Sequence, residues 1–371
     1  MNRARLPIPP MGPRDHCSRV QHLLELRACM KTKKFNYDLP KHLIAQYPTK
    51  NRTDSRLLVA LDCVKHEKFK SIVNYFNAGD LLVLNHTSVI PARLFGEKIT
   101  GGKVEVLLER FLDANRTLVQ LKSSRATKEL SELFFIHGNH RVSAKVIGRR
   151  NNFFILDWSS DPHDIFLSLG QIPLPSYMQR APEKIDEERY ETIYANPDKK
   201  ESVAAPTAGM HFDSSLLKEI EDKGVTIGYI NLQVGAGTFQ PVKTENISDH
   251  VIHKELIEVD LTLINQIKET KSKGKKVIAV GTTSVRAIET ACQLEYQPFK
   301  GETDLFIYPG YEFKVVDCML TNFHLPKSSL LMLVAAFIGY EQMMNLYNLA
   351  IAKEYRFLSY GDAMLIKYHE I

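Results

Sequence analysis

Hydrophobic and polar positions follow two different patterns along the chain, and the change of pattern divides the chain into regions. Short apolar runs at residues 57–62 and 80–85 predict buried strands, and residues 41–47 have the spacing of a short helix. Between Pro91 and Pro162 there is no proline, and short alternating runs are separated by Gly, Asn and Asp. About six strands at such spacing predict a small all-β barrel.

The second half of the chain alternates strand and helix patterns. Apolar runs at residues 225–234 and 276–281 predict strands. Asp213 and Asp260 stand where N-caps belong, and Gly224 follows the first helical pattern as a C-terminal stop. Helical patterns cover residues 214–224, 261–274, 283–293, 330–340 and 341–355. This alternation predicts a parallel or mixed sheet covered by helices.

Together these patterns predict an α/β fold with a mixed sheet, in a discontinuous main domain interrupted by a small antiparallel β-barrel. We expect residues 30–88 and 172–371 to form the α/β domain and residues 89–171 to form the inserted barrel. Residues 1–29 are rich in Pro and Arg and lack the apolar core of a secretory signal. They are expected to be a disordered extension, with a mitochondrial-type targeting segment as the alternative.

The composition is that of an ordinary globular protein. The 371 residues are 44% hydrophobic and 25% charged, which argues against a disordered chain, a collagen-like repeat and a coiled coil. The net charge is +5, of which residues 1–29 hold +3, so nucleic-acid binding would need a local basic patch. Five scattered cysteines without a CxxC pair favour the cytoplasm. The longest apolar run, residues 330–338, is shorter than the roughly 18 residues of a membrane span.

Three segments combine small residues with the start of a helix or the end of a strand. Residues 204–212 precede a capped helix and contain His211, which could move a proton near neutral pH. Residues 234–241 contain a Gly-Ala-Gly turn that could lie against an adenosine-like group, without the third glycine of a dinucleotide loop. Residues 277–286 end a strand at Gly281 and open a helix with hydroxyl residues, which favours a carboxylate or phosphate ligand. The alternatives are an ordinary loop with a capping histidine and a well-capped helix.

Two further segments carry histidines. Residues 249–255 hold two His and two carboxylates, but no other Cys or His lies nearby in sequence, so a hydrogen-bonded acid/base pair is favoured over a metal site. On the strand expected there, His253 and Glu255 share one face. Residues 322–326 and 360–364 place polar side chains next to turns, as at an active-site rim. Buried polar residues with satisfied hydrogen bonds are the competing interpretation.

Eight segments taken in order closely resemble the S-adenosylmethionine:tRNA ribosyltransferase-isomerase family of queuosine biosynthesis. They are YDLP (37–40), NHTSVIPARLFG (85–96), AAPTAGMHF (204–212), VGAGTFQPV (234–242), DHVIHKE (249–255), VIAVGTTSVRAIE (277–289), IYPGYEFKVVDCMLTNFHLPKSSLLMLV (307–334) and YRFLSYGDAM (355–364). The resemblance extends over residues 30–371. It implies an α/β domain in two chain segments around a small β-barrel.

The resemblance also implies the reaction and its partners. The ribosyl part of S-adenosylmethionine is transferred to 7-aminomethyl-7-deazaguanine at the tRNA wobble position, giving epoxyqueuosine-tRNA and releasing adenine and methionine. The positive sulfonium acidifies the C5′ protons, so a positioned base could create an ylide-like carbanion. No metal or redox cofactor is required. We expect a cytoplasmic monomer that acts without a membrane.

On this basis the chemical segments receive roles. The expected acid/base set is His211, His253, Glu255, His324 and Asp362. The expected S-adenosylmethionine contacts are Pro206, Thr207, Ala208, Gly209, Gly235, Ala236, Gly237, Thr238, Gly281, Thr282, Thr283, Ser284 and Arg286. Either Arg286 or the three hydroxyl residues at 282–284 would meet the carboxylate. The expected tRNA contacts are Arg52, Arg56, Arg93 and Arg180.

This chain departs from the family pattern at three positions. Ser88 stands where the family usually has a basic residue, and Ser176 and Gln179 stand where it often has Pro and Lys. We expect these changes to weaken tRNA affinity and to leave the reaction intact. Two other classes remain open: an S-adenosylmethionine methyltransferase, whose Gly-rich first loop is absent, and a non-catalytic tRNA-binding relative. Analysis of the products distinguishes all three.

Overall fold

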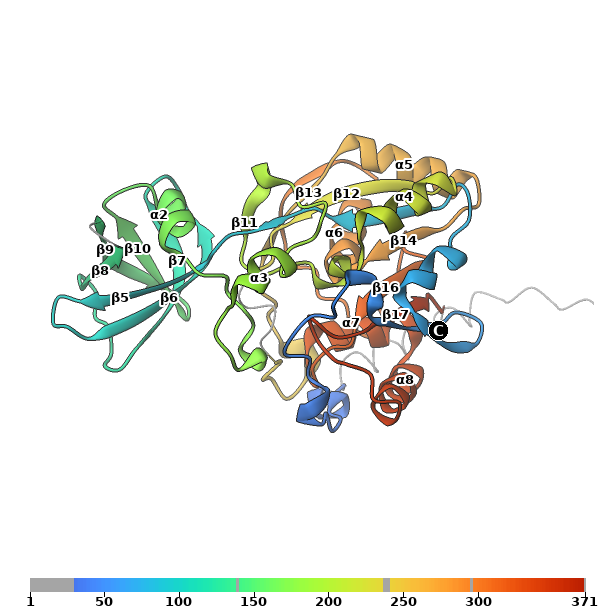
Figure 1. Ribbon diagram of the computed structural model, residues 1–371, viewed down its shortest axis with the longest axis horizontal. Coiled ribbons are helices and arrows are strands. Elements are labelled where there is room, and N and C mark those ends of the chain that lie inside the picture. The colour runs from blue at the N-terminus through green and yellow to red at the C-terminus, as the bar shows by residue number, and fades with distance from the viewer. Residues whose placement is uncertain (1–29, 138–139, 236–240, 294–295, 370–371) are drawn as a thin grey trace, which may run out of the picture.

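The chain folds into a small barrel and a larger α/β body (Figure 1). The computed structural model describes residues 30–137, 140–235, 241–293 and 296–369. The expectations about residues 1–29 fall outside the described residues.

The larger body is built on one mixed sheet of nine strands in the order β15-β13-β12-β3-β14-β16-β17-β1-β2. Its centre is parallel, since β12, β3, β14 and β16 run side by side, while β13, β15, β17 and β2 bring in antiparallel pairs. The strands are β1 (Arg56–Ala60), β2 (Val64–Lys68), β3 (Leu81–Asn85), β12 (Thr226–Leu232), β13 (Glu255–Val259), β14 (Val277–Val280), β15 (Phe299–Thr303), β16 (Cys318–Asn322) and β17 (Ala363–Lys367). The predicted mixed sheet is confirmed.

Helices cover both faces of this sheet because its central strands are apolar on both sides. Leu82 and Leu84 of β3 join the apolar cluster of α4, whereas Leu81 and Val83 join that of α5, α6 and α7. Asp213 and Asp260 cap α4 and α5 as expected, each accepting a backbone N–H at 2.8 Å. The helices are α4 (Ser214–Asp222), α5 (Leu261–Ser272), α6 (Gly281–Gln293), α7 (Ser329–Ile338) and α8 (Tyr340–Ala352).

The smaller body is a closed six-stranded antiparallel barrel in the order β10-β7-β6-β5-β8-β9. Its strands are β5 (Arg93–Lys98), β6 (Lys103–Phe111), β7 (Arg116–Ser123), β8 (Glu132–His137), β9 (His140–Arg150) and β10 (Phe153–Trp158). Alternate residues such as Val104, Val106 and Leu108 fill its interior, and α2 (Pro162–Leu169) packs Phe166 against the same core. The predicted barrel and fold class are confirmed. The exact domain limits stay predictions.

Two short strands lie on the segments that connect the two bodies. Strand β4 (Ser88–Val89) pairs in parallel with β11 (Lys200–Ser202). The remaining elements are α3 (Lys184–Arg189) and 3-10 helices at Thr32–Phe35, Lys41–Leu43, Arg52–Asp54, Phe69–Tyr75, Ser176–Met178, Pro197–Lys199, Thr207–His211 and Ile247–Asp249.

Two local predictions were wrong. The helix expected at residues 41–47 is a single 3-10 turn, because the backbone of Leu43 and Ala45 bonds instead with Phe357. The strand expected to include residues 251–253 begins only at Glu255, where pairing with Thr303 starts. His250 and His253 therefore lie on a loop rather than on a strand.

In the described part of the chain, no single helix has the length and apolarity of a membrane span. Helices α7 and α8 pass that test only as a pair, and they meet at a bend of 115°.

Candidate active site

A first pocket opens where β14 and β16 end, the edge of a parallel sheet at which ligands commonly bind. It encloses about 670 Å³, part of it open to solvent. We define the first pocket by its lining residues: Tyr177, Ala205, Pro206, Thr207, Ala208, Val234, Gly281, Thr282, Thr283, Thr321, Asn322, Phe323, His324, Leu325, Ser328, Leu330, Leu358 and Ser359.

The N-terminus of α6 forms one wall of the first pocket. Gly281 joins β14 to α6 with φ +85°, a left-handed conformation that favours glycine. The hydroxyl of Thr283 is buried and has no hydrogen-bond partner among the described residues. Ser284 turns away and donates to the carbonyl oxygen of Val280 at 2.8 Å. The first turn of α6 therefore offers an unused hydroxyl and a partial positive charge to an anionic group.

His211 lies just behind this pocket in a hydrogen-bonded chain. Asn322 Nδ2 donates to the carbonyl of Leu358 at 3.0 Å and to His211 Nε2 at 3.2 Å. Nε2 is then an acceptor, so the ring proton sits on Nδ1 and donates to Ser55 Oγ at 2.7 Å. Burial, and next the nearby arginines 356 and 52, lower the His211 pKa to about 3. The imidazole is neutral at pH 7.

His324 lines the first pocket directly. Its Nε2 lies 2.9 Å from Thr321 Oγ1, and burial lowers its pKa to about 3. Its backbone is held on both sides, because its N–H donates to Tyr347 Oη at 3.0 Å and its carbonyl accepts from Tyr37 Oη. This anchoring fixes a neutral ring at the pocket wall, able to accept or donate one hydrogen bond.

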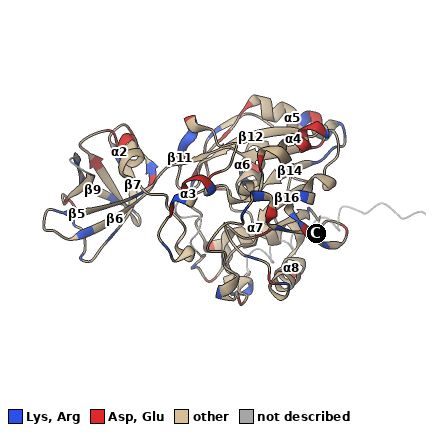
Figure 2. Cartoon of the chain, in the orientation of Figure 1, with Lys and Arg blue, Asp and Glu red and all other residues tan. Residues whose placement is uncertain are grey.

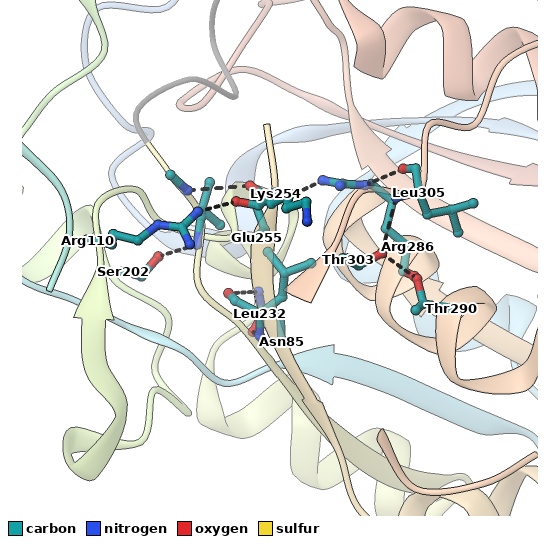
Figure 3. A network of polar contacts seen from close by, with 12 residues as sticks. Asn85, Arg110, Ser202, Leu232, Lys254, Glu255, Arg286, Thr290, Thr303 and Leu305 are labelled. Atoms are coloured by element: carbon teal, nitrogen blue, oxygen red, sulfur yellow. Dashed lines mark hydrogen bonds and ion pairs between the residues drawn. The ribbon is translucent and has the colours of Figure 1, made fainter. Parts of the chain in front are cut away.

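A second pocket lies between the barrel and the sheet. We define it by its lining residues: Asn152, Pro241, Lys243, Thr244, His250, Ile252, His253, Glu255, Arg286, Ser329 and Leu330. Figure 3 shows the polar network on one side of it, in which Glu255 of β13 pairs with Arg286 of α6. Gly235 N–H also approaches Glu255 Oε1 at 3.4 Å. On the barrel side, the Phe153 ring lies 5.8 Å from that of His253, centroid to centroid.

The two pockets share Leu330 as a wall, and the predicted acid/base residues divide between them. His324 lines the first pocket, while His253 and Glu255 line the second. Asp362 lines neither pocket. It is 1% exposed and accepts the backbone N–H groups of Arg56 and Arg356 at 2.7 and 2.8 Å. Burial raises the pKa of this carboxyl, whose two contacts hold the turn behind His211.

The predicted S-adenosylmethionine contacts also divide. Six of them line the first pocket: Pro206, Thr207, Ala208, Gly281, Thr282 and Thr283. Gly209 lies behind the pocket, where an added Cβ would overlap Tyr194 Oη, and Ser284 is fully buried. Gly235 contacts Glu255, and Arg286 lines the second pocket. Ala236, Gly237 and Thr238 lie outside the described residues.

The four arginines predicted to contact tRNA all have intramolecular contacts. Arg180 makes two bonds to Asp186, at 2.7 and 2.8 Å, and Arg52 donates to three backbone carbonyls. Arg56 donates to two backbone carbonyls and stacks on a tyrosine, and Arg93 donates to the carbonyl of Leu174. Their guanidinium groups stabilise connecting loops, so these arginines are not freely exposed charges.

Of the three departures from the family pattern, Ser88 lies on strand β4, and Ser176 and Gln179 lie at a 3-10 turn. Ser88 is buried and donates to Glu191 Oε2 at 2.9 Å. Ser176 opens a 3-10 turn that Gln179 ends with φ +41°. Ser88 is therefore part of the interior rather than an exposed phosphate contact.

Several lining residues of the two pockets were missed from the sequence. Thr321 precedes His324 at the end of an apolar strand, a position that could have marked it. Asn322 lies in the segment 322–326 that the sequence indicated, but it received no role of its own. Tyr177 and Ser359, whose hydroxyls lie 2.5 Å apart, come from distant loops and carry no local signal. Among the described residues no group of three or more His, Cys, Asp or Glu could hold a metal ion.

Known proteins are similar to this chain in sequence and in architecture. A family model described as "Queuosine biosynthesis protein" matches residues 32–366. The chain is 48% identical over 340 residues to an S-adenosylmethionine:tRNA ribosyltransferase-isomerase of Vesicomyosocius okutanii subsp. Calyptogena okutanii (strain HA), covering 91% of this chain and 98% of that relative. It is also similar to the crystal structure of S-adenosylmethionine tRNA ribosyltransferase from Thermotoga maritima. That match has a TM-score of 0.52 and 35% identity, and covers 90% of this chain and 99% of the other.

Proposed function

The chain belongs to the S-adenosylmethionine:tRNA ribosyltransferase-isomerase family of queuosine biosynthesis, and we propose that its acceptor is 7-aminomethyl-7-deazaguanine at the tRNA wobble position. The ribosyl part of S-adenosylmethionine is transferred and rearranged, which gives epoxyqueuosine-tRNA. The C1′–N bond breaks to release adenine, and the C5′–S bond breaks to release methionine.

S-adenosylmethionine occupies the first pocket in this proposal. The observation that supports it most is the start of α6, where the buried hydroxyl of Thr283 lacks a partner among the described residues and Gly281 allows close approach. The helix N-terminus and this hydroxyl suit the methionine carboxylate. Pro206, Thr207, Ala208 and Thr282 complete the wall around the rest of the molecule.

The acid/base work is assigned to groups on both sides of Leu330. His324 is the candidate that lines the pocket assigned to the ribosyl donor, and its neutral ring does not repel the positive sulfonium. His211 orients Asn322 and acts as a positioning residue, with Asp362 holding the turn behind it. His253 and Glu255 face the acceptor from the second pocket. The proposed reaction calls for no metal or redox cofactor.

Contacts with tRNA are proposed on the barrel, to which Arg93 belongs, in addition to Arg52, Arg56 and Arg180. Residues 93–158 hold 12 Lys and Arg against 7 Asp and Glu, a surplus of five equal to the net charge of the whole chain. Figure 2 shows where these charges lie. A net surplus of basic residues in one domain favours contact with a phosphate backbone. The enzyme is proposed to act as a cytoplasmic monomer.

The experiment is chromatography of the products formed from S-adenosylmethionine and tRNA carrying the aminomethyl-deazaguanine. We expect adenine and methionine in equal amounts and epoxyqueuosine in the tRNA. S-adenosylhomocysteine would identify a methyltransferase and overturn the proposal. Binding of tRNA without any product would identify a non-catalytic relative. Alanine at His324 or His253 should reduce turnover, and normal turnover in both variants would remove them from the acid/base set.

A further inference from the structure

We propose that the second pocket receives the deazaguanine base itself, and that Arg286 and Glu255 read its hydrogen-bonding edge. This inference rests on the proposed function and adds the location and the recognition of the acceptor. It takes Arg286 away from the methionine carboxylate, because Arg286 lines the second pocket with Glu255 whereas Thr282 and Thr283 line the first.

Arg286 and Glu255 form a buried pair with donor capacity left over. Their side chains are 5% and 3% exposed, and Nη1 of Arg286 contacts Oε2 of Glu255. Arg286 Nε donates to the carbonyl of Leu305 at 3.1 Å, which fixes the plane of the guanidinium. Its Nη2 is buried and has no partner anywhere in the described ranges. Buried donors without partners are uncommon in folded proteins, and at a pocket wall a ligand that accepts a hydrogen bond would satisfy this one.

The pair matches the edge of a guanine-type base. Such a base presents the O6 acceptor beside two donors, N1–H and the 2-amino group. Arg286 Nη2 can donate to O6, and the Glu255 carboxylate, with about four acceptor positions, can accept from N1–H or the amino group in addition to its contacts with Arg286 and Gly235. Flipped or unpaired bases are commonly read in this way. The pair carries no net charge, so the neutral hydrogen-bonding edge of a base suits it better than a phosphate.

The walls of the second pocket fit a nucleotide that belongs to an RNA strand. Asn152 comes from the turn between β9 and β10, next to the exposed Arg149 and Arg150. Arg149 also donates to the carbonyl of Thr127 at 3.3 Å and stacks on Phe154, whereas no side-chain contact is found for Arg150 among the described residues. Cations at this position suit the phosphates that flank the base. On the other side the pocket shares Leu330 with the first pocket, which brings the base next to the ribosyl donor.

The test uses anticodon stem-loop RNAs that carry 7-aminomethyl-7-deazaguanine or its analogue without the 2-amino group. We expect wild-type kcat/KM for adenine release to fall about tenfold or more with the analogue, because a polar site penalises a missing partner. In Glu255→Gln the two RNAs should differ less than about threefold, while the affinity for S-adenosylmethionine stays unchanged. Glu258→Gln on the same strand, whose side chain pairs with Lys199, should keep wild-type discrimination.

Arg286→Lys provides a second variant, which keeps the positive charge and loses the planar fork. It should lose discrimination against an analogue lacking O6, so the proposal stays testable if Glu255→Gln does not fold. Wild-type discrimination in both folded variants would overturn the inference. A loss of S-adenosylmethionine affinity with base discrimination intact would also overturn it. That result would indicate that Arg286 and Glu255 bind the methionine carboxylate instead. If the wild type releases no adenine with either RNA, the proposed function itself has failed.

Discussion

Thr283 carries a buried hydroxyl without a partner among the described residues, at the first turn of α6. If the methionine carboxylate accepts from it, Thr283→Val removes a bond to a charged group worth about 1.5–3 kcal/mol. We expect the Kd for S-adenosylmethionine to rise roughly 10- to 100-fold by calorimetry. The thermal midpoint should stay the same or rise, because the variant replaces an unsatisfied hydroxyl with a methyl group.

Thr283→Ser is the matched control, since it keeps the hydroxyl and loses only a methyl group. It should bind S-adenosylmethionine within a few-fold of wild type. Equal affinity in the valine variant would show that the carboxylate lies elsewhere.

His211 makes stability depend on pH in a defined direction. Its pKa is lowered to about 3 in the folded state, against about 6.5 in the unfolded chain. Between those values the unfolded state binds a proton that the folded state does not, so stability falls as pH falls from 6.5 towards 3 and is fully present above 6.5. Each such histidine contributes at most about 1.4 kcal/mol per pH unit.

Urea unfolding at pH 7.0, 6.0 and 5.0 measures this slope. His211→Gln should reduce the slope by up to one proton, apart from its own effect on stability. A slope unchanged by His211→Gln would mean that the ring is protonated in the folded protein.

The junction between β14 and α6 is the element whose geometry the sequence predicted best. The apolar run 277–280 is local and Gly281 interrupts it before a run of hydroxyl residues, so strand, turn and helix start all follow from neighbouring positions. The partner of Arg286 could not be predicted in this way, because Glu255 lies 31 residues earlier in the chain, on strand β13. The predicted start of β13 was wrong for a similar reason, because the first residue of this strand depends on where β15 ends.

Two glycines with left-handed backbones allow the effect of backbone strain to be distinguished from the effect of a contact with the site. Gly281 has φ +85° and Gly274, at the end of α5, has φ +66°. Alanine at either position costs about 1–2 kcal/mol through backbone strain. Only at Gly281 would the new Cβ meet site atoms, 3.3 Å from Thr283 Oγ1 and 3.6 Å from Ala208 Cβ. We expect Gly281→Ala to weaken S-adenosylmethionine binding about tenfold, whereas Gly274→Ala, with nothing within 4 Å of its Cβ, binds normally. Equal affinities for S-adenosylmethionine in the two variants would show that the start of α6 does not contact the ligand.

At the scale of the whole molecule, the barrel could be predicted from its strand spacing, but its contact with the sheet could not. Arg110 of β6 donates to the carbonyl of Lys254 at 2.8 Å and pairs with Glu302. These contacts help to form the second pocket between the two bodies, and no spacing along the chain indicates them. For the same reason, the four arginines chosen from the sequence are bound internally, while the charge surplus gathers on the barrel.

This distribution of charge predicts how tRNA binding responds to salt. Lys145, Arg149 and Arg150 are exposed on β9, and Arg150 lies beside the turn that lines the second pocket. If they neutralise phosphates, replacing all three by alanine should lower the slope of log K against log salt by about 2, since each lost contact removes roughly 0.7–0.9. Lys218, Lys268 and Lys273 are equally exposed on α4 and at the end of α5, at the other end of the molecule (Figure 1), and their triple alanine variant should keep the wild-type slope. Both variants should retain kcat at saturating tRNA, because neither removes a residue of the two pockets. An equal slope in the wild type and the β9 variant would place the phosphate track on another face of the protein.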